Sequence, residues 1–284
     1  MPLIVYICVN YGSPSETLAH LEQLRGSTTE PYAAVVVENS PRSYPELDDW
    51  VARYPDNHRY LVGDGNVGYL NGLGIGMRRA MQDWPHADWV VLSNVDLILD
   101  ASQFELYLAT HQLDPRTGVV GPRIVSSMSM KDQNPFLMTR PSLSRMRAWR
   151  GMYRSYWIGA LYQLGSDLWH RHAMRGLDSG RPHHPAANTS AGGREVYAVH
   201  GSIFCMSARL LHEVGAVSWP CFLFGEEIWL AEKARNLGMR VIYDPAMRVE
   251  HSEHATTASL SSREKMRWHH QSINWLIENH WEKA

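Results

Sequence analysis

Four side chains spread along the chain are of types that bind divalent cations or accept protons. Asp96 ends an apolar run of strand length that begins at Val90. Glu226 and Glu227 open a helical pattern, and His251 follows a short strand pattern. Carboxylates and imidazole together suit Mn²⁺ or Mg²⁺, and a carboxylate within reach of a hydroxyl group can act as a general base. These residue types indicate a metal site beside a proton acceptor.

Each of these groups also has a simpler structural interpretation. Polar pairs such as Asn94 and Asp96 commonly end a strand by forming a turn. Acids in the first turn of a helix, such as Glu226 and Glu227, stabilise the helix dipole. His251 is one of 15 histidines, and any one of them taken singly is more often structural. The surrounding elements must decide between the two interpretations.

In the first half of the chain, strands alternate with helices. Buried strands are predicted at residues 3–9, 33–37, 59–62, 90–92 and 119–124, with helices ending near residues 25, 53, 82 and 111. This alternation is typical of a parallel sheet with right-handed crossovers. Ligands of such sheets bind outside the carboxyl ends of the strands, which is where Asp96 is predicted to lie.

The second half carries the glutamates and the histidine. The pattern predicts two short strands bent at Gly201, helices at 207–214 and 226–238, strands at 239–243 and 247–251, and a final helix at 262–281. Residues 126–193 have little regular pattern apart from an amphipathic helix over 145–164 and a loop over 179–193. All four candidate side chains therefore stand at strand or helix ends.

A run of glycines lies between Gly63 and Gly76, ahead of and within a helical pattern. Glycines allow close backbone approach and free amides at a helix start, as phosphate and nucleotide sites require. No Walker-type lysine follows, and Gly72, Gly74 and Gly76 do not follow a strand as a dinucleotide fingerprint requires. A loop with close helix packing is the alternative.

Composition limits the class of protein. With 284 residues, 44% of them hydrophobic and 20% charged, the chain can form one large α/β domain and is not disordered. No apolar run is long enough to span a membrane, and the N-terminus lacks the features of a signal peptide. We therefore expect a cytoplasmic location. Cys8, Cys205 and Cys221 lack metal-ligand spacing and are interpreted as reduced core residues.

The segment from Arg140 to Arg194 is the most unusual in composition. It holds nine arginines, no lysine and two acids, so it carries +7 while the chain as a whole carries −2. One interpretation is a peripheral contact with an anionic membrane at its inner face, made by the side chains Arg147, Arg150, Arg154, Trp149, Tyr153 and Trp157. The alternative is an ordinary insertion with a local aromatic core. Nucleic acid is not expected, because the overall charge is negative and no recognition motif is present.

An enzyme that transfers a sugar from a nucleotide needs a cation for the diphosphate leaving group and a carboxylate base for the acceptor hydroxyl. The order of the groups resembles the family 2 inverting glycosyltransferases of the GT-A fold, especially the bacterial rhamnosyltransferase-like branch that builds surface polysaccharides. The resemblance covers residues 3–124 and 195–252.

The first-half motifs of that family have counterparts here. Val9-Asn10-Tyr11 is similar to the turn after the first strand, and Glu38-Asn39-Ser40 to the Asp-Asn-Xaa-Ser motif whose acid holds the nucleoside. Asn66-Val67-Gly68-Tyr69 resembles the glycine-rich stretch along the nucleotide. Asn94-Val95-Asp96 stands for the Asp-Xaa-Asp motif, whose last acid binds the cation.

The second-half motifs follow in the same order. Gly201-Ser202, after His200, resembles the glycine turn beside the acceptor. Gly225-Glu226-Glu227 stands for the Glu-Asp motif, whose second acid is the base, and Val249-Glu250-His251 for the metal-binding histidine. Three departures are Asn94 in place of an acid, Glu227 in place of a shorter aspartate, and Leu73-Gly74 where the family often has two asparagines. The second departure leaves Glu226 open as the base.

The resemblance implies a single GT-A domain over 1–284, with a mostly parallel sheet flanked by helices. Within it we expect a nucleotide-sugar half at 1–124, a variable insertion at 125–194, an acceptor and catalytic half at 195–252, and a C-terminal helix at 253–284. The implied reaction moves a sugar from a UDP- or dTDP-sugar to a glycan or lipid-linked glycan. A non-catalytic carbohydrate- or nucleotide-binding subunit and a sugar-nucleotide pyrophosphorylase are the alternatives.

Overall fold

The computed structural model describes residues 3–29, 31–154, 193–215, 217, 219–252 and 261–282. By their contacts the residues divide into two compact units, one formed by 1–140 and 193–256 and the other by 141–192 and 257–284. The domain boundaries expected from the sequence differ from this division, and a single folding domain stays a prediction. None of the described helices is long and apolar enough to cross a membrane.

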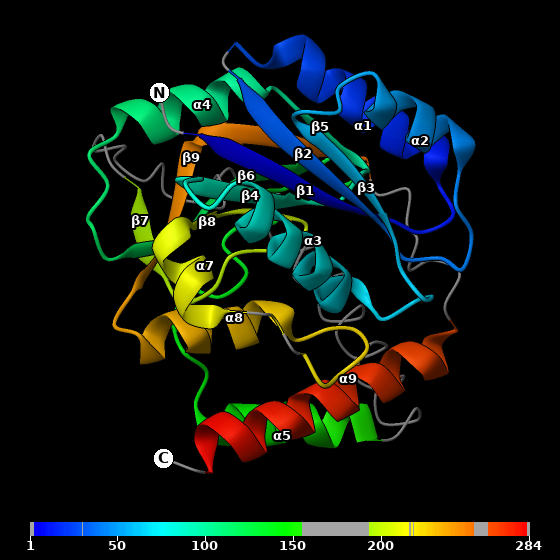
Figure 1. The fold of residues 1–284 in the computed structure, drawn as a ribbon. Coiled ribbons are helices and arrows are strands. Elements are labelled where there is room, and N and C mark those ends of the chain that lie inside the picture. Colours follow the sequence, from blue (N-terminus) through cyan, green and yellow to red (C-terminus); the bar gives the residue numbers. More distant parts are fainter. Residues whose placement is uncertain are drawn as a thin grey trace. The chain divides into compact units, whose positions relative to one another are not determined.

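The first unit is built on one mixed sheet of nine described strands (Figure 1). Its spatial order is β3-β2-β1-β4-β8-β6-β9-β5, with β7 paired to β9. The strands are β1 (Ile4–Asn10), β2 (Tyr32–Glu38), β3 (His58–Val62), β4 (Trp89–Ser93), β5 (Leu97–Leu99), β6 (Thr117–Ser126), β7 (Arg194–Val196), β8 (Ile203–Ser207) and β9 (Arg240–His251). β1 to β4 pair in parallel and so do β6 and β9, whereas β8 runs antiparallel to β4 and β6. The expected mostly parallel α/β sheet is confirmed.

Helices cover both faces of this sheet (Figure 1). They are α1 (Pro14–Ser27), α2 (Pro45–Ala52), α3 (Tyr69–Asp83), α4 (Ala101–Thr110), α7 (Ala208–Val214) and α8 (Glu226–Asn236). Alternate residues of β1 point to opposite faces: Tyr6 and Cys8 join core clusters with α1, α2 and α4, whereas Ile7 and Val9 lie under α3.

One sequence prediction about this unit needs correction. The strands predicted at 239–243 and 247–251 are one strand, β9, because both parts pair with β6 across a register shift at Pro122 and Arg123. The glycine run lies ahead of and within a helix, as expected, since α3 begins at Tyr69. A Cβ on Gly72 or Gly76 would lie 3.1 or 2.4 Å from β1 side chains, so these glycines serve close helix–sheet packing.

The described part of the second unit consists of α5 (Leu143–Arg154), α9 (Ser262–Leu276) and a π-helical end at Ile277–Trp281. Ser261 caps α9 through a capping box with Glu264. Tyr153 stacks on His269 with ring centroids 4.5 Å apart, and the Trp281 indole donates to the Pro141 carbonyl at 2.9 Å. The predicted helix at 145–164 is described only to residue 154, and Trp157 and nearly all of the loop at 179–193 lie outside the described residues.

Candidate active site

Asp96 and His251, 155 residues apart in sequence, are neighbours in the structure. β5 pairs antiparallel with β9, and Leu97 lies opposite His251. The Ser252 amide also donates to the Asp96 carbonyl at 3.0 Å. This register brings His251 Nε2 to 3.2 Å from Asp96 Oδ2, with the two side chains only 12% and 11% exposed. The strand pairing therefore creates a shared carboxylate–imidazole site.

The free atoms of this pair suit a cation. Gln133 Oε1 lies 2.8 Å from His251 Nδ1 and can only accept, so in the tautomer that makes this hydrogen bond Nδ1 carries the proton and Nε2 keeps a free lone pair. Asp96 Oδ1 is buried and has no hydrogen-bond partner among the described residues. Within the same residues no cluster of three or more His, Cys, Asp or Glu is present. Asp96 and His251 are therefore two side chains that could hold a cation together.

Glu226 and Glu227 lie at the N-terminus of α8, next to the left-handed Gly225. Burial, followed by the charge of Glu227, raises the pKa of Glu226 to about 8. Burial also raises the pKa of Glu227, against backbone hydrogen bonds from its own amide and that of Gly201. Glu226 Oε2 is buried, and no described residue offers it a hydrogen bond. Such a pair holds a proton near neutral pH, as an acid–base site requires.

Gly201 connects the glutamates to the rest of the site. A Cβ at this position would lie 3.0 Å from Glu227 Oε1, so a side chain here would crowd the carboxylate. The Tyr69 hydroxyl donates to the Gly201 carbonyl at 3.2 Å. Burial raises the pKa of Tyr69 well above its usual value, with further contributions from the charges of Glu226 and Asp96. Tyr69 thus lies within electrostatic range of both carboxylate groups.

The turn at 200–202 borders both the histidine and the aspartate. The His200 ring lies with its centroid 6.3 Å from that of His251, and its Nδ1 is 3.0 Å from the Ser202 hydroxyl. The Asn94 amide donates to the Ser202 carbonyl at 2.7 Å. The structure thus brings His200, Gly201 and Ser202 together with the acidic residues.

The predicted nucleoside residues form a second group at the carboxyl ends of β1 and β2. Glu38 is fully buried and accepts hydrogen bonds from Asn10, the Ser40 amide and Tyr60. Asn10 is also buried, and its Oδ1 accepts from Thr17. In the turn that follows β1, Tyr11 is 45% exposed. Val9, which lies within β1, is only 9% exposed. Glu38 and Asn10 therefore support the turn from beneath.

The loop ahead of α3 is held against the loop ahead of α8. Asn39 donates to Asn66 Oδ1 at 3.1 Å and to the Gly68 carbonyl at 3.2 Å. A Cβ on Gly68 would lie 2.0 Å from the Phe222 carbonyl, and its φ of +87° is left-handed. Only glycine fits at this position. The nucleotide-side loop thereby packs directly on the segment that leads to the glutamates.

Comparison with known proteins identifies the family. The model described as glycosyltransferase like family 2 matches residues 1–270. The chain belongs to this family. It is therefore a glycosyltransferase, and the resemblance inferred from the motifs is confirmed. A curated relative from Mycobacterium tuberculosis (strain CDC 1551 / Oshkosh), N-acetylglucosaminyl-diphospho-decaprenol L-rhamnosyltransferase, is 23% identical over 96% of this chain and 84% of its own length.

Solved structures agree on the fold. GalNAc-T7 with UDP, GalNAc and Mn²⁺ matches with a TM-score of 0.61 at 11% identity, over 100% of this chain and 57% of that one. Mannosyltransferase PcManGT from Pyrobaculum calidifontis, with GDP-Man and Mn²⁺, gives 0.54 at 15% identity, over 90% and 59%. The glycosyltransferase thus spans under three fifths of the length of these two chains. The GT-A fold is confirmed.

Sequence reasoning missed several residues around this glycosyltransferase site. Gln133 and Asn134 were placed in a variable insertion, although they contact His251 and His200. Tyr69 was noted only as part of a motif. His20 lies behind the metal motif, where its Nε2 is 3.1 Å from the Ser93 hydroxyl and burial lowers its pKa to about 4. The signal for Gln133 is a polar Asp-Gln-Asn run just after a strand, at the ligand-binding end of the sheet.

Proposed function

We propose that this glycosyltransferase is metal-dependent and inverting, and that it transfers a sugar from a nucleoside diphosphate to a hydroxyl of a glycan or lipid-linked glycan in bacterial surface polysaccharide synthesis. The observation that carries the proposal is the Asp96–His251 pair, with Nε2 3.2 Å from Oδ2 and with Oδ1 free of protein donors. Family membership favours this function over a non-catalytic subunit or a pyrophosphorylase.

Asp96 and His251 would hold Mn²⁺ or Mg²⁺. When bound, the cation supplies positive charge that neutralises the departing diphosphate. The presence of Mn²⁺ with a nucleotide or nucleotide sugar in both structural neighbours supports this assignment. The departure at Asn94 leaves one carboxylate in the motif, and the backbone N–H of Asn94 holds the Ser202 carbonyl.

Glu227 is the proposed base. The Gly201 amide bonds to its carboxylate and orients it, whereas the raised pKa of Glu226, about 8, favours the protonated form of that neighbour at neutral pH. With the single proton on Glu226, ionised Glu227 takes the proton of the acceptor hydroxyl as its oxygen attacks the sugar C1 opposite the diphosphate. His200, Gly201 and Ser202 would border the acceptor.

The donor would lie along the carboxyl ends of β1 and β2. Tyr11 offers the surface for the nucleoside, with Val9, Asn10 and Glu38 as its buried support and Asn66 and Gly68 along its other side. A UDP- or dTDP-sugar is the proposed donor. The name of the mycobacterial relative supports a lipid-linked diphosphate acceptor, which would be reached at the inner face of the plasma membrane.

The test compares Asp96→Ala and Glu227→Gln with surface variants of the same chemistry, Asp49→Ala and Glu213→Gln. We expect Asp96→Ala to lose Mn²⁺-dependent stabilisation by UDP or dTDP in a thermal-shift assay, and Glu227→Gln to keep it. Both should lose transfer while retaining the circular dichroism spectrum of the wild type. Full transfer activity in both variants would reject the assignment.

A further inference from the structure

The segment after β6 forms a wall behind both histidines of the site. The Gln133 backbone amide donates to the Ile124 carbonyl at 2.8 Å, and Asp132 Oδ1 accepts from the Ile124 backbone amide at 3.1 Å. The Asn134 side chain donates to the Pro122 carbonyl at 2.8 Å and accepts from the His200 amide at 2.7 Å. Residues 132–134 are therefore tied to β6, and the side chains of Gln133 and Asn134 reach His251 and the His200 amide.

We propose that Gln133 is a positioning residue that holds His251 in the tautomer and orientation needed to bind the cation. This inference rests on the proposed function. The supporting contact is the hydrogen bond from His251 Nδ1 to Gln133 Oε1, 2.8 Å long. Gln133 lies outside every motif that carried the family resemblance, in the segment expected to be variable.

The hydrogen-bonding chemistry of Gln133, His251 and Asp96 supports this role. A neutral imidazole has one N–H, and both of its partners here, Gln133 Oε1 and Asp96 Oδ2, are acceptors. With the proton on Nδ1, the Nε2 lone pair points at the carboxylate, and the two face each other at 3.2 Å. That arrangement is favourable when a cation lies between or beside them. Outer hydrogen bonds of this type fix the ring of a metal-binding histidine.

A neutral amide is well suited to this position. A carboxylate there would accept the same hydrogen bond but add a second negative charge behind the ligand, whereas leucine would fill the space with no acceptor. These two replacements separate the hydrogen bond from the shape of the side chain. Gln103 provides a matched control, because it is a partly buried glutamine on α4 whose Oε1 accepts only a long bond of 3.4 Å from the Arg248 amide.

The experiment titrates Mn²⁺ into each protein in the presence of UDP or dTDP, using whichever nucleotide stabilises the wild type more. Electron paramagnetic resonance gives the Mn²⁺ dissociation constant, and its pulsed form detects coupling to an imidazole nitrogen. We expect Gln133→Leu to weaken Mn²⁺ binding by roughly 10- to 100-fold and to diminish the nitrogen coupling. Gln133→Glu should stay near the wild type, and Gln103→Leu should match it. His251→Ala sets the level without nitrogen coupling.

The outcomes distinguish this inference from the function it rests on. Wild-type protein with no nitrogen coupling would overturn the proposed cation site itself. If the wild type shows nitrogen coupling and Gln133→Leu shows the same coupling and the same Mn²⁺ affinity, only the role of Gln133 is overturned. Equal losses in Gln133→Glu and Gln133→Leu would show that the accepted hydrogen bond is not the cause, and they would also reject the proposal.

Discussion

The pKa of Glu226 results from opposing effects of burial and of the helix end at which it lies. Ionising Glu226 requires a charge in a buried place beside Glu227, so its pKa rises to about 8. The α8 amides favour negative charge at this helix end, but they do not outweigh burial. A site that keeps one proton and one charge gives up stability in order to hold a base, as functional sites commonly do.

This cost predicts a pH-dependent effect of Glu226→Gln. The folded-state pKa of Glu226 lies above that of the unfolded chain, so its contribution to stability is full below about pH 4 and is lost as pH rises towards 8. Glutamine stays neutral, so the free energy of unfolding of Glu226→Gln relative to wild type should rise between pH 5 and 8, by at most about 1.4 kcal/mol per pH unit. Urea unfolding at several pH values measures it. Glu213→Gln should show no such trend. If the free energies of unfolding of Glu226→Gln and wild type differ by the same amount at every pH, the prediction is contradicted.

At the level of residues, the sequence predicts reactive side chains better than the residues that hold them in place. Asp96, His251 and the glutamates were found because carboxylates and imidazoles at element ends are conspicuous. Gln133 escaped notice because its role depends on one hydrogen bond across 118 residues of sequence. Glu38 was expected to touch the nucleoside, and its burial beneath the turn follows from packing that no local pattern encodes.

Among the elements, α3 and the loop before α8 form one packed body. The Asn71 side chain donates to the Trp219 carbonyl at 2.8 Å and accepts from its amide at 2.9 Å. A Cβ on Gly74 would lie 2.9 Å from Val217. The sequence identified the glycines as close-approach positions, but it could not show what they approach. Gly68 and Gly74 approach the segment that leads to the glutamates, whereas Gly72 and Gly76 approach β1.

Gly68→Ala should therefore disturb both loops. Alanine would strain a φ of +87° and clash with the Phe222 carbonyl at 2.0 Å, which should lower the free energy of unfolding by about 3 kcal/mol. Chemical denaturation measures this loss. Gly215→Ala is the matched control, because its φ is +63° and nothing lies within 4 Å of the added Cβ. It should cost only about 1 kcal/mol. Equal losses would mean that the contact with Phe222 is unimportant.

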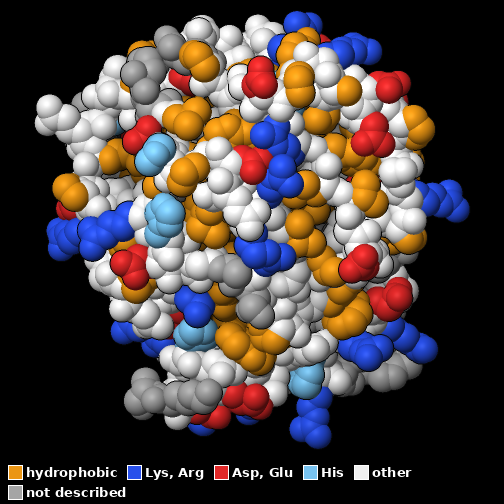
Figure 2. Space-filling view, viewed as in Figure 1, with side chains coloured by type: hydrophobic (Ala, Val, Ile, Leu, Met, Phe, Trp, Pro, Cys, Tyr) orange, Lys and Arg blue, Asp and Glu red, His pale blue; other side chains and the backbone are white. Residues whose placement is uncertain are grey.

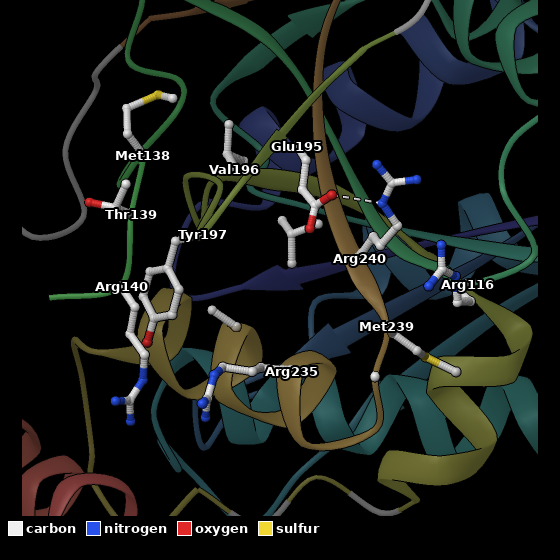
Figure 3. A pocket seen from close by; sticks show the side chains of 13 residues that line it. Arg116, Met138, Thr139, Arg140, Glu195, Val196, Tyr197, Arg235, Met239 and Arg240 are labelled. Atoms are coloured by element: carbon white, nitrogen blue, oxygen red, sulfur yellow. Dashed lines mark hydrogen bonds and ion pairs between the residues drawn. The ribbon is translucent and has the colours of Figure 1, made fainter.

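A cavity at the other end of α8, lined by Arg140, Tyr197 and Arg235 among others (Figure 3), lies beside a second link between elements. Glu232, with a side chain 1% exposed, accepts from Arg140 at 2.7 and 3.0 Å and from the Tyr197 hydroxyl at 2.7 Å. Burial opposes ionisation of Glu232, but these hydrogen bonds outweigh it and hold its pKa below the usual value. The network joins α8 to the segment before α5 and to the strand region after β7.

Glu232→Ala should destabilise the protein by about 3 kcal/mol, because it leaves the arginine and the tyrosine without their shared acceptor. The depressed pKa means that this contribution is present at neutral pH and is lost on acidification, so wild type and variant should converge at low pH. Thermal unfolding across pH tests this. Glu195→Ala removes a more exposed acid–arginine pair, Glu195–Arg240, and should cost less than about 1 kcal/mol.

For the whole molecule, the excess of positive charge is concentrated in one segment of the sequence. Residues 140–194 carry nine arginines and two acids, although the chain has a net charge of −2. On the face shown in Figure 2, basic side chains are interspersed with acidic ones. Within the second unit, Arg147 pairs with Glu282 at 2.9 Å and the Arg145 guanidinium lies 4.8 Å from the Trp149 ring. The described part of the basic segment thus includes an ordered helix, α5, with its own aromatic contacts.

This arrangement predicts salt-sensitive binding to anionic vesicles at the proposed membrane face. Attraction acts over about 8 Å at physiological ionic strength, and each basic residue near such a surface contributes about 1 kcal/mol. Arg145→Glu with Arg154→Glu should therefore weaken co-sedimentation with phosphatidylserine-containing vesicles by at least tenfold. Arg78→Glu on α3, an exposed reversal outside the segment, should have little effect. Binding that is equal for neutral and anionic vesicles, or unaffected by the double reversal, would leave the segment as an ordinary insertion with a local aromatic core.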